Sequence, residues 1–141
     1  MKRILSNSVI IIMMLLSCYS CKNNITEPQA IQLEGLTLNN NEKWIANKET
    51  HMGMKRIDSI LKNNTSLSGK VLGDVLSKQT SYIIKSCDME GEAHDQLHVV
   101  LVPILEEITD IKDVKNSLDV EKKVNHLKNL TATYFEYFKI N

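Results

Sequence analysis

Apolar residues recur along most of the chain at intervals of three and four positions, which places them on one face of an α-helix. The pattern predicts four amphipathic helices, at about residues 42–62, 67–87, 92–115 and from 118 onward. No stretch alternates apolar and polar residues for long enough to predict a strand. Short connections between four such helices favour an all-α fold, an antiparallel up-down-up-down four-helix bundle.

The predicted core stripes contain a few well-spaced residues in each helix. The clearest are Trp44, His51, Met54 and Leu61 in the first helix and Leu97, Leu101, Ile104 and Ile108 in the third. The stripe of the first helix argues against an alternative bundle of three helices in which this segment stays unfolded.

The first 17 residues have the layout of a secretory signal peptide. Lys2 and Arg3 form a positive start, residues 9–16 are continuously apolar, and Ser17 and Cys18 end the run. A run of this length is too short to span a bilayer, and short apolar runs behind a positive start are typical of signal peptides.

Leu15-Leu16-Ser17-Cys18 resembles the lipobox of bacterial lipoproteins. The resemblance implies cleavage before Cys18, whose sulfur then carries diacylglycerol and whose amine is usually acylated with a chain such as palmitate. Several acyl chains anchor a protein firmly, because each buried CH₂ adds about 0.8 kcal/mol. We therefore expect a membrane-anchored protein of the cell envelope. Cys21 is a weaker candidate for the lipidated cysteine, and a plain secretory signal or an uncleaved anchor is the alternative.

The composition of residues 18–40 predicts a flexible tether, which precedes a helical domain at residues 41–141. The segment is poor in apolar residues and contains Asn, Pro and Gly, so burial cannot offset the chain entropy. Cleavage would remove Lys2 and Arg3 and leave 15 basic against 17 acidic residues, a net charge near −2. This balance argues against a nucleic-acid partner.

Sulfur and imidazole side chains concentrate between residues 87 and 98. His94 and His98 are four positions apart, so both project from one face of the third helix and can reach one ion. Cys87 and Met89 place sulfur just before this helix. Sulfur together with imidazole suits Cu(I), or Zn(II) where cysteine and histidine dominate.

The antiparallel topology brings the first part of the first helix to the same end of the bundle. His51 lies about as far into its helix as His98 lies into the third, and Met54 follows one turn later. The predicted site for copper or zinc therefore consists of Cys87, Met89, His94, His98, His51 and Met54, with no organic cofactor.

Structural roles compete with this metal site. His94 lies beside the core seam, Met54 suits core packing, and Cys87 suits a small buried position. Cys21 and Cys87 are also candidates for a disulfide, because an exported chain meets oxidising conditions. We do not expect an enzyme, because a thiol nucleophile at Cys87 would have no orienting third group or oxyanion element beside its histidine base.

The motif Cys87-x-Met89-x-Gly91-x-Ala93-His94-x-x-Leu97-His98 resembles a group of small uncharacterised helical lipoproteins that we associate with copper- or heavy-metal-handling genes. The likeness extends over the helical domain and is clearest across residues 87–103. It implies an anchored helical bundle and favours metal binding at Cys87, Met89, His94 and His98.

Two functions from different classes follow. The first is an anchored envelope protein that binds or sequesters a soft metal ion. The second is a metal-free helical interaction or adaptor module, displayed on the membrane for a protein partner. Convergence of the six side chains would favour the first, whereas a scattered set and an exposed apolar patch would favour the second.

Overall fold

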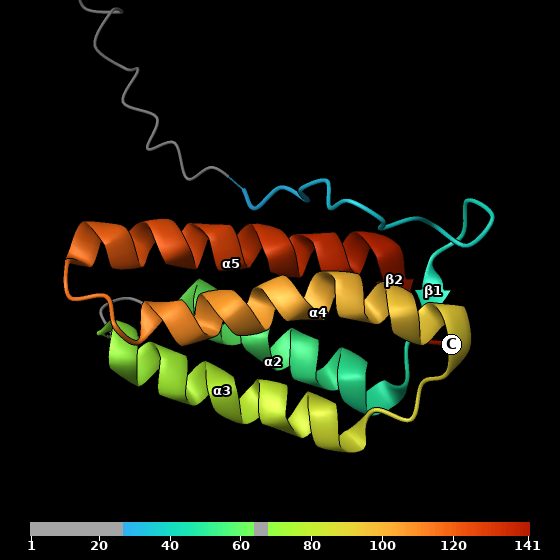
Figure 1. Cartoon of the computed structure of the whole chain (residues 1–141), viewed down its shortest axis with the longest axis horizontal. Helices are drawn as coiled ribbons and strands as arrows, with labels where there is room; N and C mark the ends of the chain where they lie inside the picture. Colours follow the sequence, from blue (N-terminus) through green and yellow to red (C-terminus); the bar gives the residue numbers. More distant parts are fainter. Residues whose placement is uncertain (1–26, 64–67) are drawn as a thin grey trace, which may run out of the picture.

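The computed structural model describes residues 27–63 and 68–141, and in this part of the chain it has four long helices and two very short strands. The predicted signal peptide (residues 1–17), Cys18 and Cys21 lie outside the described residues. The elements in chain order are β1 (Trp44–Ile45), α2 (Lys48–Asn63), α3 (Gly69–Ser86), α4 (Gly91–Ile111), α5 (Ser117–Tyr137) and β2 (Phe138–Lys139) (Figure 1). The predicted all-α four-helix bundle is confirmed.

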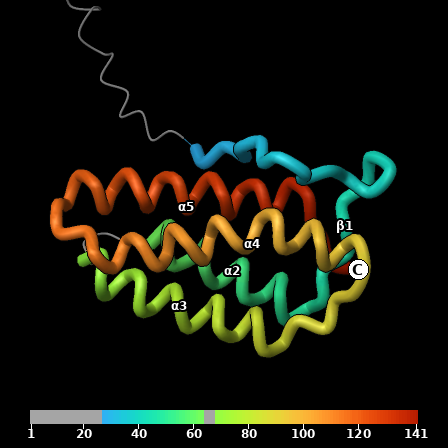
Figure 2. The backbone as a smooth tube through the Cα atoms, viewed as in Figure 1, coloured from blue at the N-terminus to red at the C-terminus, as the bar shows by residue number. Residues whose placement is uncertain are grey.

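The four helices form a closed ring around one core. Each helix packs against the next along the chain, and α5 packs back against α2. The chain reverses its direction from each helix to the next, as the tube in Figure 2 shows. Leu97, Leu101, Ile104 and Ile108 of α4 are all buried, so the core seam predicted for this helix is confirmed.

The first helix is shorter than predicted, because it begins at Lys48 and not near residue 42. Asn40 and Asn41 adopt left-handed φ angles of 51° and 66°, and reciprocal backbone hydrogen bonds of 2.9 Å between Asn39 and Glu42 close the turn. Asparagine tolerates this conformation better than most residues. A tight turn therefore occupies the predicted start of the helix.

Trp44 is buried, as its place in the stripe suggested, but it lies in β1 and not in a helix. β1 pairs in parallel with β2, with Trp44 opposite Phe138. The backbone N–H of Ala46 extends the pairing by donating to the carbonyl of Lys139. This pairing joins the segment before α2 to the end of α5.

Helix boundaries elsewhere follow local capping. Ser68 caps α3 by accepting a hydrogen bond from the Val71 N–H. Asn116 caps α5 by accepting from the Leu118 N–H at 2.9 Å. The third helix ends at Ile111, before the expected residue 115. Gly91, with φ of +60°, provides the left-handed residue at the connection between α3 and α4.

Residues 27–43, which we call the strap, lie along α5 and then cross to α4, whereas the sequence predicted a flexible tether for residues 18–40 (Figure 1). The hydroxyl of Thr133 accepts from the Ile31 N–H at 2.8 Å, and it lies 3.2 Å from the Ile31 carbonyl. The Gln96 amide accepts from the Thr37 N–H and donates to the Gly35 carbonyl. The part of the predicted tether from residue 27 onward is therefore docked on the bundle.

The start of α3 packs very closely against the end of α4. A Cβ added at Gly69 would overlap the carbonyl oxygen of Ile111 and would lie 3.0 Å from that of Val114. Only glycine, which has no side chain, allows this approach of one backbone to another.

We predict that Gly69→Ala lowers the free energy of unfolding by about 1–3 kcal/mol, because rigid backbone atoms must move to admit the methyl group. Urea denaturation followed by helical circular dichroism measures this change. Lys78→Ala on the exposed face of α3 is the matched control, with an expected change within about 0.5 kcal/mol. Equal stability of the two variants would contradict this view of the α3–α4 contact.

Candidate functional site

The six residues of the predicted metal site lie toward one end of the bundle, as the antiparallel topology requires. His51 and Met54 belong to α2, His94 and His98 belong to α4, and Cys87 and Met89 lie in the connection between α3 and α4. Their side chains nevertheless have different environments.

His51 and Met54 face the core. Met54 is completely buried, and the His51 side chain is nearly so. The Nδ1 atom of His51 lies 3.2 Å from the hydroxyl of Tyr134, and the imidazole packs edge-on against Phe135. These contacts make His51 a hydrogen-bonded core residue, and Met54 a packing residue.

Electrostatics keep both members of the His51–Tyr134 pair neutral. Burial lowers the pKa of His51, and the positive charge of Lys55 lowers it further. Burial also raises the pKa of Tyr134, with a smaller contribution from the nearby Cys87 thiol, whose negative form would repel a tyrosinate. A neutral His51 can accept a hydrogen bond from the Tyr134 hydroxyl at Nδ1, so these two buried polar atoms satisfy one another.

His94 and His98 form a close pair on the surface of α4. Their ring centroids are 4.4 Å apart and the rings meet edge-on. His98 is exposed and His94 is half-buried, so solvent reaches the pair. Of the six residues, these two have the arrangement that the i, i+4 spacing predicted.

Cys87 and Met89 are half-buried and pack against the hydrophobic core. In residues 27–63 and 68–141, no group of three or more His, Cys, Asp or Glu side chains could hold a metal ion together. Cys87 therefore does not join His94 and His98 in a three-ligand centre in this arrangement. This statement covers His, Cys, Asp and Glu ligands and does not extend to the thioether of Met89.

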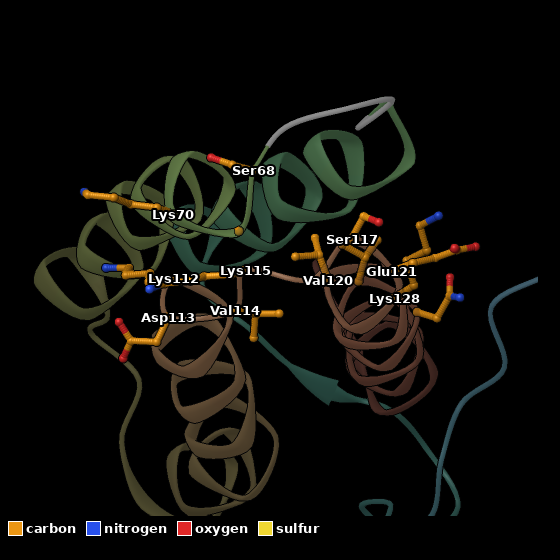
Figure 3. Close-up of a pocket in the computed structure, with 13 residues that line it drawn as sticks. Ser68, Lys70, Lys112, Asp113, Val114, Lys115, Ser117, Val120, Glu121 and Lys128 are labelled. Atoms are coloured by element: carbon orange, nitrogen blue, oxygen red, sulfur yellow. The ribbon is translucent and has the colours of Figure 1, made fainter.

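Sequence reasoning missed a wide groove at the opposite end of the bundle. The groove has a volume of about 1010 Å³ and lies between the start of α3, the α4–α5 connection and the first half of α5 (Figure 3). Its lining comes from three segments that are distant in sequence. The only signal in the sequence was the high density of lysine after residue 111, which also suits an ordinary solvated surface.

Acidification is predicted to destabilise the fold through His51. The unfolded chain binds a proton near the ordinary histidine pKa of about 6.5, whereas the folded chain binds it only at lower pH. The free energy of unfolding therefore falls as the pH drops below about 6.5. His51→Gln, measured by urea denaturation across pH 5–7.5, should weaken this dependence, whereas His98→Gln at an exposed position should leave it in place. An unchanged pH dependence in His51→Gln would refute the assignment.

Comparison with known proteins yields no matching family model, no matching curated protein and no matching solved structure. The resemblances to the lipobox and to the metal-associated lipoproteins therefore rest on the sequence motifs alone.

Proposed function

We propose that the chain is an envelope lipoprotein that holds a four-helix binding module close to the membrane. The docked strap carries this proposal, because it determines how far a lipid on Cys18 allows the bundle to move. The lipid anchor itself rests on the lipobox-like residues Leu15-Leu16-Ser17-Cys18.

The strap shortens the stretch of chain between a lipidated Cys18 and the bundle. Residues 18–26 precede the first strap residue, and a fully extended chain of this length spans about 30 Å. A tether that continued to residue 40 would span about 80 Å. Docking of residues 27–43 therefore keeps the bundle within roughly one domain diameter of the bilayer.

A binding module fits the chemistry of the described residues better than a six-ligand metal store. His51 and Met54 are occupied in the core, and the thiol of Cys87 and the imidazoles of His94 and His98 do not form a three-ligand centre in the described residues. None of the helices in the described residues is long and apolar enough to cross a membrane. The module would act through its surface, with a protein or small-molecule partner.

Lipid attachment and strap docking can be tested together on the full chain. Metabolic labelling with an alkyne-bearing palmitate should mark the wild type and leave Cys18→Ser unmarked. In vesicles with dansyl headgroups, the single tryptophan, Trp44, should transfer energy to the lipid surface. Asn129→Ala/Thr133→Val removes the side-chain partners of both Gln29 and Ile31 and should loosen the strap as far as Gly35, which raises the maximum reach to about 60 Å and lowers the transfer.

Thr131→Val is the matched control, because this buried hydroxyl donates only within α5, to the carbonyl of Leu127. Its energy transfer should equal that of the wild type. Equal transfer from all three chains would contradict strap docking, and persistent labelling of Cys18→Ser would contradict the anchor.

A second candidate function is metal binding by His94 and His98 alone. The ring separation of 4.4 Å favours it, because two imidazoles this close can share one Cu(II) or Zn(II) ion. With two protein ligands, water or a partner would complete the coordination shell.

The two-histidine site predicts a simple mutational pattern. His94→Ala and His98→Ala should each abolish most of the binding, since either change leaves one imidazole. Cys87→Ser should bind as the wild type does. Isothermal titration with Cu(II) and Zn(II), and anaerobic titration with Cu(I), provides the measurement. Dependence on Cys87 would restore the larger cysteine-histidine centre.

A further inference from the structure

The groove at the α3–α5 end combines an apolar lining with a basic rim. Val114 from the α4–α5 connection and Val120 and Val124 from α5 supply apolar surface. Val120, Val124 and Lys128 follow one another at four-residue intervals, so they share one face of α5. Figure 3 shows Val114 and Val120 pointing into the space between the elements.

Lysines dominate the charge around the groove. Its lining contains Lys70, Lys112, Lys115 and Lys128 against two acids, Asp113 and Glu121, although the whole chain has no net charge. Lys70 and Lys112 share the carboxylate of Asp74, at 2.8 Å and 3.6 Å. Among the described residues, Lys115 and Lys128 have no carboxylate within ion-pair distance. Two lysines thus remain for an external anion.

The size of the groove distinguishes between classes of occupant. A stable protein interface uses about 20–30 residues on each side, whereas 13 residues line this groove. Its volume of about 1010 Å³ lies at the upper end of the range of about 300–1,000 Å³ for small-molecule pockets. A ligand of small-molecule size therefore fits better than the surface of another protein.

We propose that this groove binds an anionic amphiphile with a single apolar chain and a carboxylate or phosphate head. The chain would lie against Val114, Val120 and Val124, and the head would pair with Lys115 or with Lys128, which are labelled on opposite sides of the groove in Figure 3. Burial of the chain provides most of the affinity, and the lysines select a negative head. The site goes beyond the proposed tethering, because it depends on neither the lipid anchor nor the strap.

Photo-crosslinking tests this on the full chain in phosphatidylcholine nanodiscs. The probe is a palmitate analogue with a diazirine on the chain and an alkyne for enrichment, and mass spectrometry locates the adducts. We expect adducts at residues 112–128. Unlabelled palmitate or lysophosphatidate should compete, and the neutral hexadecanol should not. Competition by both anions or by only one identifies the preferred head and supports the proposal in either case.

Variants of the groove distinguish binding of the probe at a specific site from labelling by probe that is dissolved in the lipid. Lys115→Glu/Lys128→Glu should lower labelling at residues 112–128 about fivefold, because one surface ion pair corresponds to at most about fivefold in affinity. Val120→Trp should lower it by filling the groove with no change in charge. Lys78→Glu/Lys85→Glu makes the same charge change on exposed positions of α3 and should leave labelling unchanged.

Three results would overturn the proposal. They are adducts spread evenly over the chain, equal competition by hexadecanol, and equal losses in the groove and control variants. A change of oligomeric state in the groove variants, with labelling unaltered, would assign the groove to a second copy of the chain and would also overturn it. Circular dichroism of each variant establishes that the helices remain folded.

Discussion

Burial of the Tyr134 side chain determines the environment of the His51 imidazole. Its ring is fully buried and stacks on Phe138 with centroids 5.0 Å apart, so its hydroxyl has little access to water and needs a protein partner. His51 is that partner, at 3.2 Å. Tyr134 thus connects α5 with α2 through His51. Through its stacking on Phe138 it also connects these helices with the β1–β2 pair. An imidazole held in this contact has only its Nε2 atom left for a metal ion, and it could bind one only in the tautomer in which Nδ1–H donates to the Tyr134 hydroxyl.

The helices could be predicted from the sequence because their periodicity is local. Leu97, Ile104 and Ile108 define the face of α4 without reference to any other segment. The pairing of His94 with His98 could be predicted for the same reason, since helix geometry alone brings the two rings together. The role of His51 could not, because it depends on a tyrosine 83 positions later.

The strap shows a different limit of sequence reasoning. Its few apolar residues gave no periodic pattern, and its hydrogen bonds join backbone groups to distant side chains, 59 positions away for Thr37 to Gln96 and 102 for Ile31 to Thr133. Asparagine and glycine suggested flexibility, whereas Asn40 and Asn41 form the turn that directs the chain into β1. Composition measures how much apolar surface a segment can bury, but it does not reveal polar contacts supplied by a folded neighbour. The groove escaped prediction similarly, since three distant segments build it.

The order of contacts along the strap has a mechanical consequence for a chain pulled from its N-terminal side. Tension would first reach the hydrogen bonds of Gln29 with Asn129 and of Ile31 with Thr133, and only later those of Gly35 and Thr37 with Gln96. The β1–β2 pairing lies behind all of them. Pulling would therefore peel the strap in steps while the helices keep their core. The docked segment would thus yield to tension before the helical core does.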